Sequence, residues 1–65
     1  MKITVNGEEL SIGPMSVLGY LDAVGIDPRR VAVELNLDIL PKGNYAATML
    51  KEGDRVEIVH FVGGG

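Results

Sequence analysis

The sequence contains no cysteine, which excludes disulfide bonds, thiolate zinc sites and thiol nucleophiles. Its one histidine, His60, cannot form a histidine-rich metal site, and we expect it to make an ordinary hydrogen bond at the end of a sheet. No apolar run approaches the roughly 20 residues that a membrane helix needs, and the first residues do not resemble a signal peptide. We therefore expect a cytoplasmic protein with no bound metal and no contact with a membrane.

Aromatic and basic residues are also scarce. The 65 residues include two tyrosines and one phenylalanine, and six basic residues stand against nine acidic ones. A nucleic-acid partner requires clustered lysine and arginine with stacking rings, so this class of partner is disfavoured. A chain with so few catalytic groups is not expected to be an enzyme. The length allows a single domain, and 46% hydrophobic residues are typical of one that folds.

Residues 1–12 alternate between apolar and polar side chains around Asn6-Gly7. Asn-Gly between two such runs predicts a β-hairpin, because both residues tolerate the positive φ of a type I′ turn. A two-residue turn fixes the register and leaves one face of the hairpin apolar. The predicted cross-strand pairs are Val5 with Glu8, Thr4 with Glu9, and Ile3 with Leu10.

A short helix is predicted after Gly13-Pro14. Ser16 suits the N-cap, Gly25 suits the left-handed position that ends a helix, and Ile26 can then contact Leu21 as in a Schellman motif. Glycine inside a helix costs about 1 kcal/mol relative to alanine, so we expect Gly19 to serve close packing against the sheet. The apolar residues that recur at helical spacing are Val17, Leu18, Leu21 and Val24.

The second half of the chain predicts two further strands. The first covers residues 31–35 and the last covers residues 55–62, with an irregular segment between them that includes one helical turn at residues 46–50. Pro41 suits the edge of a sheet, because proline donates no hydrogen bond to the ladder. This order predicts an α+β roll in which one helix covers one face of a four- to five-stranded mixed sheet.

Alternation along the last strand turns Val56 and Ile58 toward the core and Val59 and Phe61 outward. Large apolar side chains on an exposed face indicate a small contact patch, so we predict that Val59, Phe61 and the following Val62 bind a partner protein. A strand that twists and tucks Phe61 over an edge is the alternative. The acidic residues Asp54 and Glu57 are expected to be solvated surface residues rather than a catalytic pair.

Three consecutive glycines, Gly63, Gly64 and Gly65, follow the folded domain predicted for residues 1–62. Glycine costs backbone entropy and buries no side chain, so folding gives no reason for this flexible tail. Without side chains, the segment fits a narrow channel, where the Gly65 carboxylate can approach a nucleotide phosphate. The extended reach from residue 62 to residue 65 is about 13 Å. A frayed terminus or a leftover linker is the alternative that the residues alone leave open.

The most specific motif is the closing run EGDRVEIVHFVGGG at residues 52–65. Three other segments accompany this run: the Asn6-Gly7 hairpin, VAVELN at residues 31–36 and LPK at residues 40–42. With these motifs the whole chain resembles the ThiS family of sulfur carrier proteins, which are small ubiquitin-like proteins of thiamin biosynthesis. The resemblance implies the β-grasp form of the α+β roll, with its main helix on one face of the mixed sheet.

The resemblance also implies a mechanism centred on Gly65, with Gly63 and Gly64 as its arm. An E1-like (ThiF-like) adenylyltransferase uses ATP and magnesium to convert the terminal carboxylate into an acyl-adenylate. Sulfur from a cysteine desulfurase then replaces AMP, and the resulting thiocarboxylate donates its sulfur to a ThiG-like thiazole synthase. The chain itself holds no cofactor and no catalytic residue in this scheme.

Other readings stay open. A β-grasp carrier for molybdopterin synthase, tRNA thiolation or cysteine synthesis shares the same terminal chemistry, although the short helix favours ThiS. A protein-interaction module that transfers nothing would bind a partner through the sheet and leave the glycines inert. Ubiquitin-like conjugation to lysine is a third possibility.

Overall fold

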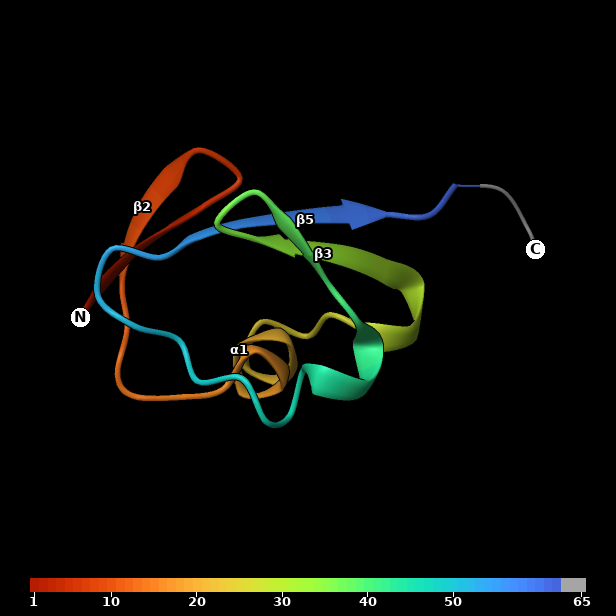
Figure 1. Ribbon diagram of the computed structural model, residues 1–65, viewed down its shortest axis with the longest axis horizontal. Helices are drawn as coiled ribbons and strands as arrows, with labels where there is room; N and C mark the ends of the chain where they lie inside the picture. The colour runs from red at the N-terminus through yellow and green to blue at the C-terminus, as the bar shows by residue number, and fades with distance from the viewer. Residues whose placement is uncertain (63–65) are drawn as a thin grey trace.

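The structure, a computed structural model, describes residues 1–62. Its five strands form one mixed sheet in the order β2-β1-β5-β3-β4. The helix α1 lies across one face of this sheet, as Figure 1 shows. The strands are β1 (Lys2–Val5), β2 (Glu8–Ser11), β3 (Val31–Leu35), β4 (Asp38–Leu40) and β5 (Arg55–His60). The helices are α1 (Val17–Ala23) and the single 3-10 turns η1 (Pro28–Arg30) and η2 (Lys42–Asn44).

The two central strands, β1 and β5, run parallel, and the other neighbours in the sheet run antiparallel. The hairpin β1–β2 lies on one side of β5 and the hairpin β3–β4 lies on the other. The parallel pair of β1 and β5 joins the first and last strands of the chain. This mixed five-stranded sheet with one main helix on one face confirms the predicted α+β, β-grasp fold. The path of β5 along the middle of the sheet is visible in Figure 1.

The β1–β2 hairpin has the predicted turn and register. Asn6 and Gly7 adopt φ values of 48° and 82°, as a type I′ turn requires. The pairs Val5–Glu8, Thr4–Glu9 and Ile3–Leu10 are all observed.

Helix α1 begins and ends with the predicted caps. The Ser16 hydroxyl accepts a hydrogen bond from the Gly19 N–H at 2.9 Å. At the other end, the Ile26 N–H donates to the Leu21 carbonyl at 2.8 Å and the Gly25 N–H donates to the Asp22 carbonyl at 3.1 Å, which is the Schellman pattern. Gly25 has the left-handed φ of 77° that this motif needs.

One detail of the helix prediction is wrong. A Cβ on Gly19 would lie 3.3 Å from the Ser16 Oγ, so the close approach is to the helix's own cap and not to the sheet. Val24 has the predicted helical spacing, but it follows the last helical residue and is half exposed.

The segment between β3 and β5 also departs from the prediction. Residues 38–40 form the edge strand β4, which pairs with β3 across a two-residue turn at Asn36 and Leu37. The helical turn lies at η2, not at residues 46–50, where Met49 instead forms a bridge with Ser16. The last strand ends at His60 rather than at residue 62, although the Phe61 N–H still donates to the Arg30 carbonyl at 2.9 Å.

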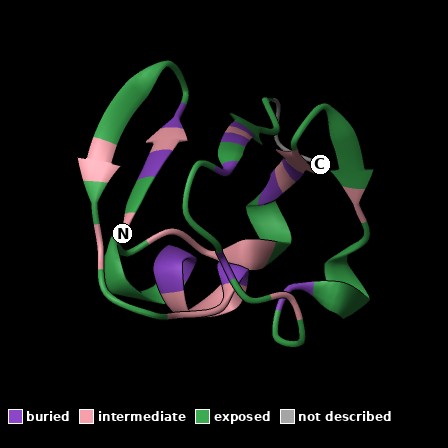
Figure 2. Ribbon diagram, turned by 60° about the vertical axis from the view of Figure 1, so that its left-hand side comes forward, coloured by how far each residue is buried: buried purple, intermediate pink, exposed green. Residues whose placement is uncertain are grey.

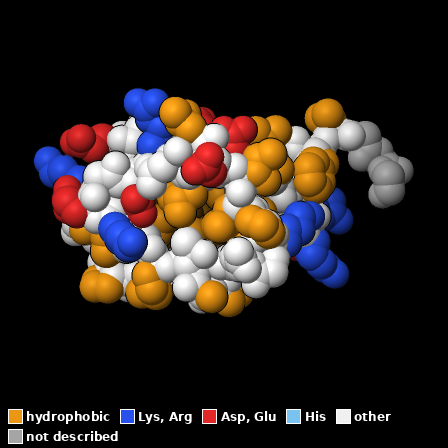
Figure 3. Space-filling view, viewed as in Figure 1, with side chains coloured by type: hydrophobic (Ala, Val, Ile, Leu, Met, Phe, Trp, Pro, Cys, Tyr) orange, Lys and Arg blue, Asp and Glu red, His pale blue; other side chains and the backbone are white. Residues whose placement is uncertain are grey.

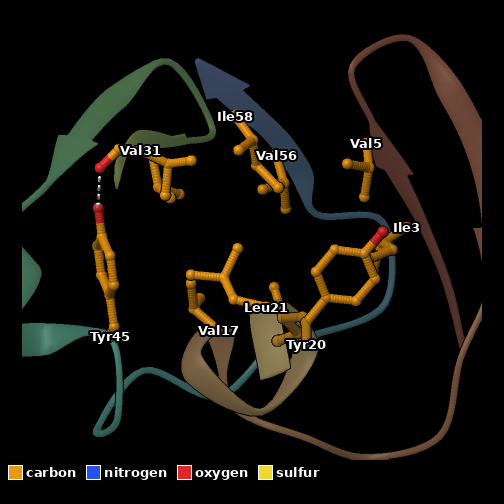
Figure 4. Packing of buried hydrophobic residues seen from close by; sticks show 11 residues of the cluster. Ile3, Val5, Val17, Tyr20, Leu21, Val31, Tyr45, Val56 and Ile58 are labelled. Atoms are coloured by element: carbon orange, nitrogen blue, oxygen red, sulfur yellow. Dashed lines mark hydrogen bonds between the residues drawn. The ribbon is translucent and has the colours of Figure 1, made fainter. Parts of the chain in front are cut away.

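The core lies between the inner face of the sheet and α1. Figure 2 shows buried residues, in purple, both in α1 and in strands of the sheet. In Figure 4, Leu21 and Val17 point from the helix toward Val56 and Val31 on the sheet, and Tyr45 closes one end. The buried hydrophobic residues are Ile3, Val5, Val17, Tyr20, Leu21, Val31, Val33, Tyr45, Leu50, Val56 and Ile58.

Candidate functional site

The outer face of the sheet, opposite α1, carries the predicted contact residues. Val56 and Ile58 are buried, while Val59 and Phe61 are each 57% exposed. The outward orientation of Val59 and Phe61 is therefore confirmed, and the alternative in which Phe61 tucks over an edge is not observed. Val62 is 97% exposed. The predicted site residues Gly63, Gly64 and Gly65 lie outside the described residues.

Cross-strand register divides this outer face into rows. Ala32 of β3 lies opposite Val59 of β5, and one step further along the sheet Glu34 lies opposite Glu57. Ile39 of β4 lies on the other side of Glu34 and is 78% exposed. Opposed residues point to the same face of a sheet, so an apolar row adjoins a row that contains two carboxylates.

Basic residues surround Phe61 where the chain leaves β5. The Lys42 Nζ lies 4.8 Å from the centre of the Phe61 ring, within cation–π distance, and donates to the Arg29 carbonyl at 3.0 Å. The neighbouring Arg30 supplies the carbonyl that accepts from the Phe61 N–H. In the view of Figure 3, Lys and Arg atoms gather at the end of the molecule from which the C-terminal segment leaves.

One acidic side chain, that of Asp27, lies among these bases. Its carboxylate accepts hydrogen bonds from the Arg29 guanidinium at 3.0 and 3.1 Å and lies 3.7 Å from the Arg30 Nε. The hydrogen bonds from the Arg29 side chain and its N–H lower the pKa of the Asp27 carboxyl from 3.8 to about 2. The same pairing raises the pKa of Arg29. Asp27 therefore orders the arginine pair and stays ionised at neutral pH.

We call Arg29, Arg30 and Lys42 the basic cluster. Part of this cluster is visible in the sequence, since Arg29 and Arg30 are adjacent bases in an acidic chain. Lys42 is brought to them only by the fold, through its bond to the Arg29 carbonyl. None of the three was predicted as a site residue, and Lys42 entered only as part of the LPK motif.

Asp54 is not the solvated surface residue that the sequence analysis expected. It is buried, and its carboxylate accepts hydrogen bonds from the Asn36 side chain at 3.0 Å and from the Lys51 N–H at 2.8 Å. These partners close the turn before β5, which gives Asp54 a structural role. Glu57 is only partly buried and faces outward, as predicted.

His60 ends β5 and is exposed. It lines an open hollow of about 500 Å³ on the inner side of the sheet, together with residues that include Tyr20 and Glu8. Within residues 1–62, no group of three or more His, Cys, Asp or Glu side chains could hold a metal ion. No helix in the described part of the chain is long and apolar enough to cross a membrane.

Comparisons with known proteins agree with this geometry. The model of the ThiS family matches residues 3–65. The sulfur carrier protein ThiS of Bacillus subtilis is 38% identical over 50 residues, which cover 77% of this chain and 76% of that protein. The crystal structure of thiamine biosynthesis protein ThiS from Geobacter metallireducens superposes with a TM-score of 0.86 at 36% identity, and the match covers both chains completely.

A different kind of relative shares more identity. A thiazole synthase of Paramagnetospirillum magneticum is 48% identical over 66 residues, which cover all of this chain and 20% of that protein. A thiazole synthase of Magnetococcus marinus is 44% identical with the same coverage. The chain therefore spans about a fifth of the length of these two relatives.

Proposed function

The chain belongs to the ThiS family, and we propose that it is a sulfur carrier of thiamin biosynthesis that bears its sulfur on the carboxylate of Gly65. The observation that carries this proposal is the match to the family model, which extends through residue 65 and so includes the three glycines. The likeness to the ThiS proteins of two organisms supports the same reading.

The chemistry requires a polypeptide that ends at Gly65 with a free carboxylate. A carboxylate is a poor electrophile, so a carboxylate oxygen first attacks the α-phosphate of ATP, and pyrophosphate leaves. The terminal sulfur of a persulfide then attacks the carbonyl carbon of the acyl-adenylate, and AMP leaves with the oxygen. A second thiol then attacks the donor's sulfur in the resulting acyl disulfide. It forms a new disulfide with that sulfur, and the S–S bond of the acyl disulfide breaks to release the thiocarboxylate.

The partners perform every catalytic step in this scheme. An E1-like, ThiF-like adenylyltransferase binds ATP and magnesium, and a cysteine desulfurase supplies the persulfide sulfur. The carrier supplies recognition through its folded body, and we propose Val59, Phe61 and Val62 as contact residues. Their exposure supports this role, and Val59 lies on the face of the sheet that α1 leaves uncovered.

A thiazole synthase is the proposed acceptor of the sulfur. The similarity of this chain to a fifth of two thiazole synthases supports the pairing of the two activities. A thiocarboxylate is a strong sulfur nucleophile at neutral pH, so it can deliver sulfur to an electrophilic carbon without releasing free sulfide.

Rescue of a thiamin auxotroph that lacks its own carrier tests the pathway. The wild-type chain should restore growth without thiamin, and a chain with Gly65 deleted should not. Growth with the deleted chain would contradict a role for the Gly65 carboxylate. A wild-type chain that instead restores molybdopterin synthesis, tRNA thiolation or cysteine synthesis would assign it to another sulfur pathway.

The contact residues need a separate test. The double variant Val59→Ser, Phe61→Ser should weaken binding to the adenylyltransferase and leave the fold intact, because both side chains are more than half exposed. Val24→Ser, at a half-exposed valine beside the helix, is the matched control. Equal affinity of the double variant and the wild type would remove Val59 and Phe61 from the interface.

A further inference from the structure

The turn at Asn6-Gly7 combines a reactive dipeptide with a side chain that the fold holds in place. The backbone nitrogen that follows an asparagine can attack the side-chain amide, and glycine leaves this nitrogen uncrowded because it has no Cβ. Both residues are exposed, and a Cβ on Gly7 would meet no atom of a non-adjacent residue within 4 Å. We propose that Asn6 is a site of spontaneous deamidation, which its hydrogen bonds to Ile58 suppress in the native fold.

The reaction uses the chain itself and water. The Gly7 nitrogen loses its proton and bonds to the Cγ of Asn6, and the side-chain nitrogen leaves as ammonia. Water then adds to one of the two carbonyls of the resulting succinimide ring and breaks the bond from that carbon to the ring nitrogen. Opening at Cγ gives aspartate. Opening at the main-chain carbonyl gives isoaspartate, in which the main chain runs through the former side chain.

Hydrogen bonds to β5 oppose this attack in the native fold. The Asn6 Oδ1 accepts from the Ile58 N–H at 2.7 Å, and the Asn6 Nδ2 donates to the Ile58 carbonyl at 3.2 Å. The Asn6 N–H donates to the Val56 carbonyl at 2.9 Å. Ring closure requires rotation about the Cα–Cβ and Cα–C bonds of Asn6. The bonds to Ile58 fix the first rotation, and the type I′ turn fixes the second.

The protection lasts only while Asn6 and β5 stay together. The parallel ladder between β1 and β5 is short, since its register covers Thr4–Arg55 and Val5–Val56, and Asn6 bonds beyond it. Local separations of this kind cost less free energy than unfolding of the whole domain. One separation frees both the Ile58 N–H and the Asn6 amide. Hydrogen exchange at Ile58 and ring closure at Asn6 therefore report the same event.

A second asparagine has the same arrangement without the reactive neighbour. Asn36 also adopts a left-handed φ, of 52°, and its Oδ1 accepts from the Arg55 N–H at 2.9 Å. The next residue is Leu37, and its side chain crowds the attacking nitrogen. Both hairpin turns thus hold β5 through an asparagine side chain, and the glycine makes the first turn the reactive one.

Deamidation changes how firmly β5 is held. Aspartate at this position keeps an acceptor for the Ile58 N–H, but it sets a carboxylate oxygen against the Ile58 carbonyl and loses that bond. Isoaspartate also adds a carbon to the main chain of a two-residue turn, whose geometry sets the hairpin register. The ammonia is lost to solvent, so modified chains accumulate with age. This inference concerns the folded body alone and does not depend on the proposed function.

The test follows deamidation and hydrogen exchange of the full chain at mildly alkaline pH, over a series of urea concentrations up to complete unfolding. Mass spectrometry with fragmentation locates the replacement of NH2 by OH, and NMR measures exchange of the Ile58 N–H. In native buffer, conversion at Asn6 should be at least about tenfold slower than in the unfolded chain. Below the unfolding transition, its rate should rise with urea in parallel with exchange at Ile58.

The controls separate the reactive site from its protection. In the unfolded chain, Asn36 and Asn44 should convert more slowly than Asn6, and Gly7→Ala should slow conversion at Asn6 whether or not this variant folds. Equal rates at the three asparagines, or no effect of Gly7→Ala, would overturn the site. A rate at Asn6 that ignores urea while Ile58 exchange accelerates would overturn the protection, because the closed turn would then react.

The consequence is measured on the purified isoaspartate form. Exchange of its Ile58 N–H should be roughly tenfold faster than in the unmodified chain, because the bonds from Asn6 are lost. The Asn6→Asp variant, which keeps the acceptor, should lie between the two. Equal protection of Ile58 in all three chains would contradict the claim that deamidation loosens β5.

Discussion

The Asn6 side chain forms two hydrogen bonds with the backbone of Ile58. Its Oδ1 accepts from the Ile58 N–H at 2.7 Å, and its Nδ2 donates to the Ile58 carbonyl at 3.2 Å. The parallel pairing of β1 with β5 covers Thr4–Arg55 and Val5–Val56, so the side chain extends the ladder where β1 turns away. A residue chosen for a tight turn thus also holds the strand that leads to Gly65.

Replacing Asn6 should separate these two roles. Asn6→Gly tolerates the positive φ but leaves the Ile58 N–H and carbonyl without their partner, so we expect a loss of about 1–3 kcal/mol of unfolding free energy. Asn6→Asp keeps the acceptor and loses the donor, which should cost less. Urea denaturation measures both. If Asn6→Gly is as stable as the wild type, the two hydrogen bonds add nothing and only the turn matters.

Leu37 carries backbone strain that a single substitution should relieve. It adopts a φ of 75° in the β3–β4 turn, and 74% of the residue is exposed. The left-handed conformation costs a residue with a side chain roughly 1–2 kcal/mol, so Leu37→Gly should raise stability by about 0.5–1 kcal/mol after the entropy of glycine is counted. Ile39→Gly, at an equally exposed position within β4, should lower it. A lower melting temperature for Leu37→Gly would show that the leucine side chain stabilises the turn.

The Asp27 carboxyl predicts a specific dependence on pH. Its pKa is lowered from 3.8 to about 2 by the bonds from Arg29, so its contribution to stability is present above pH 3.8 and is lost as pH falls toward 2. The difference in melting temperature between wild type and Asp27→Asn should be constant above about pH 4.5 and shrink below it. A constant difference from pH 2 to pH 6 would show that the ionised carboxylate contributes no stability.

Removing one carboxylate from the Glu34–Glu57 pair should stabilise the fold. Like charges opposite each other cost roughly 0.2–1 kcal/mol, and salt screens this repulsion. Glu57→Gln should therefore raise the melting temperature at low salt, and the gain should shrink at high salt. Glu8→Gln is the matched control, because Glu8 lies opposite Val5 rather than another acid. An equal gain from both variants would point to net charge instead of the pair.

Features set by neighbouring residues could be predicted from the sequence. The Asn6-Gly7 turn fixed the first hairpin register, and the caps of α1 depend on Ser16 and Gly25 alone. The outward orientation of Val59 and Phe61 follows from the two-residue period of a strand, which holds as long as the pleat continues. Continued alternation would turn Val62 toward the core, but Val62 is exposed. The strand ends at His60, and the hydrogen bond from Phe61 to Arg30 is the last one that the described residues make along it.

Features that depend on distant residues could not be predicted. Leu37 is not a turn-forming residue, so the residues of the β3–β4 turn do not predict a hairpin. The left-handed backbone of Leu37 is unfavourable, and the pairing of β4 with β3 offsets this strain. Asp54 is buried because Asn36, 18 residues away, donates to its carboxylate. Lys42 joins the basic cluster through a bond to Arg29 across 13 residues.

The most direct test of the central claim is labelling of Gly65 after incubation with ATP, magnesium, a ThiF-like adenylyltransferase and a sulfur donor. Sulfur in place of oxygen changes the mass almost as much as oxidation of Met1, Met15 or Met49 does. The chain has no cysteine, however, so a thiol-directed alkylating reagent has only a thiocarboxylate to modify. We predict one alkyl group that depends on ATP, that fragmentation places on Gly65, and that is absent when Gly65 is deleted. No label on the wild-type chain, with an enzyme that modifies a known carrier, would contradict the account.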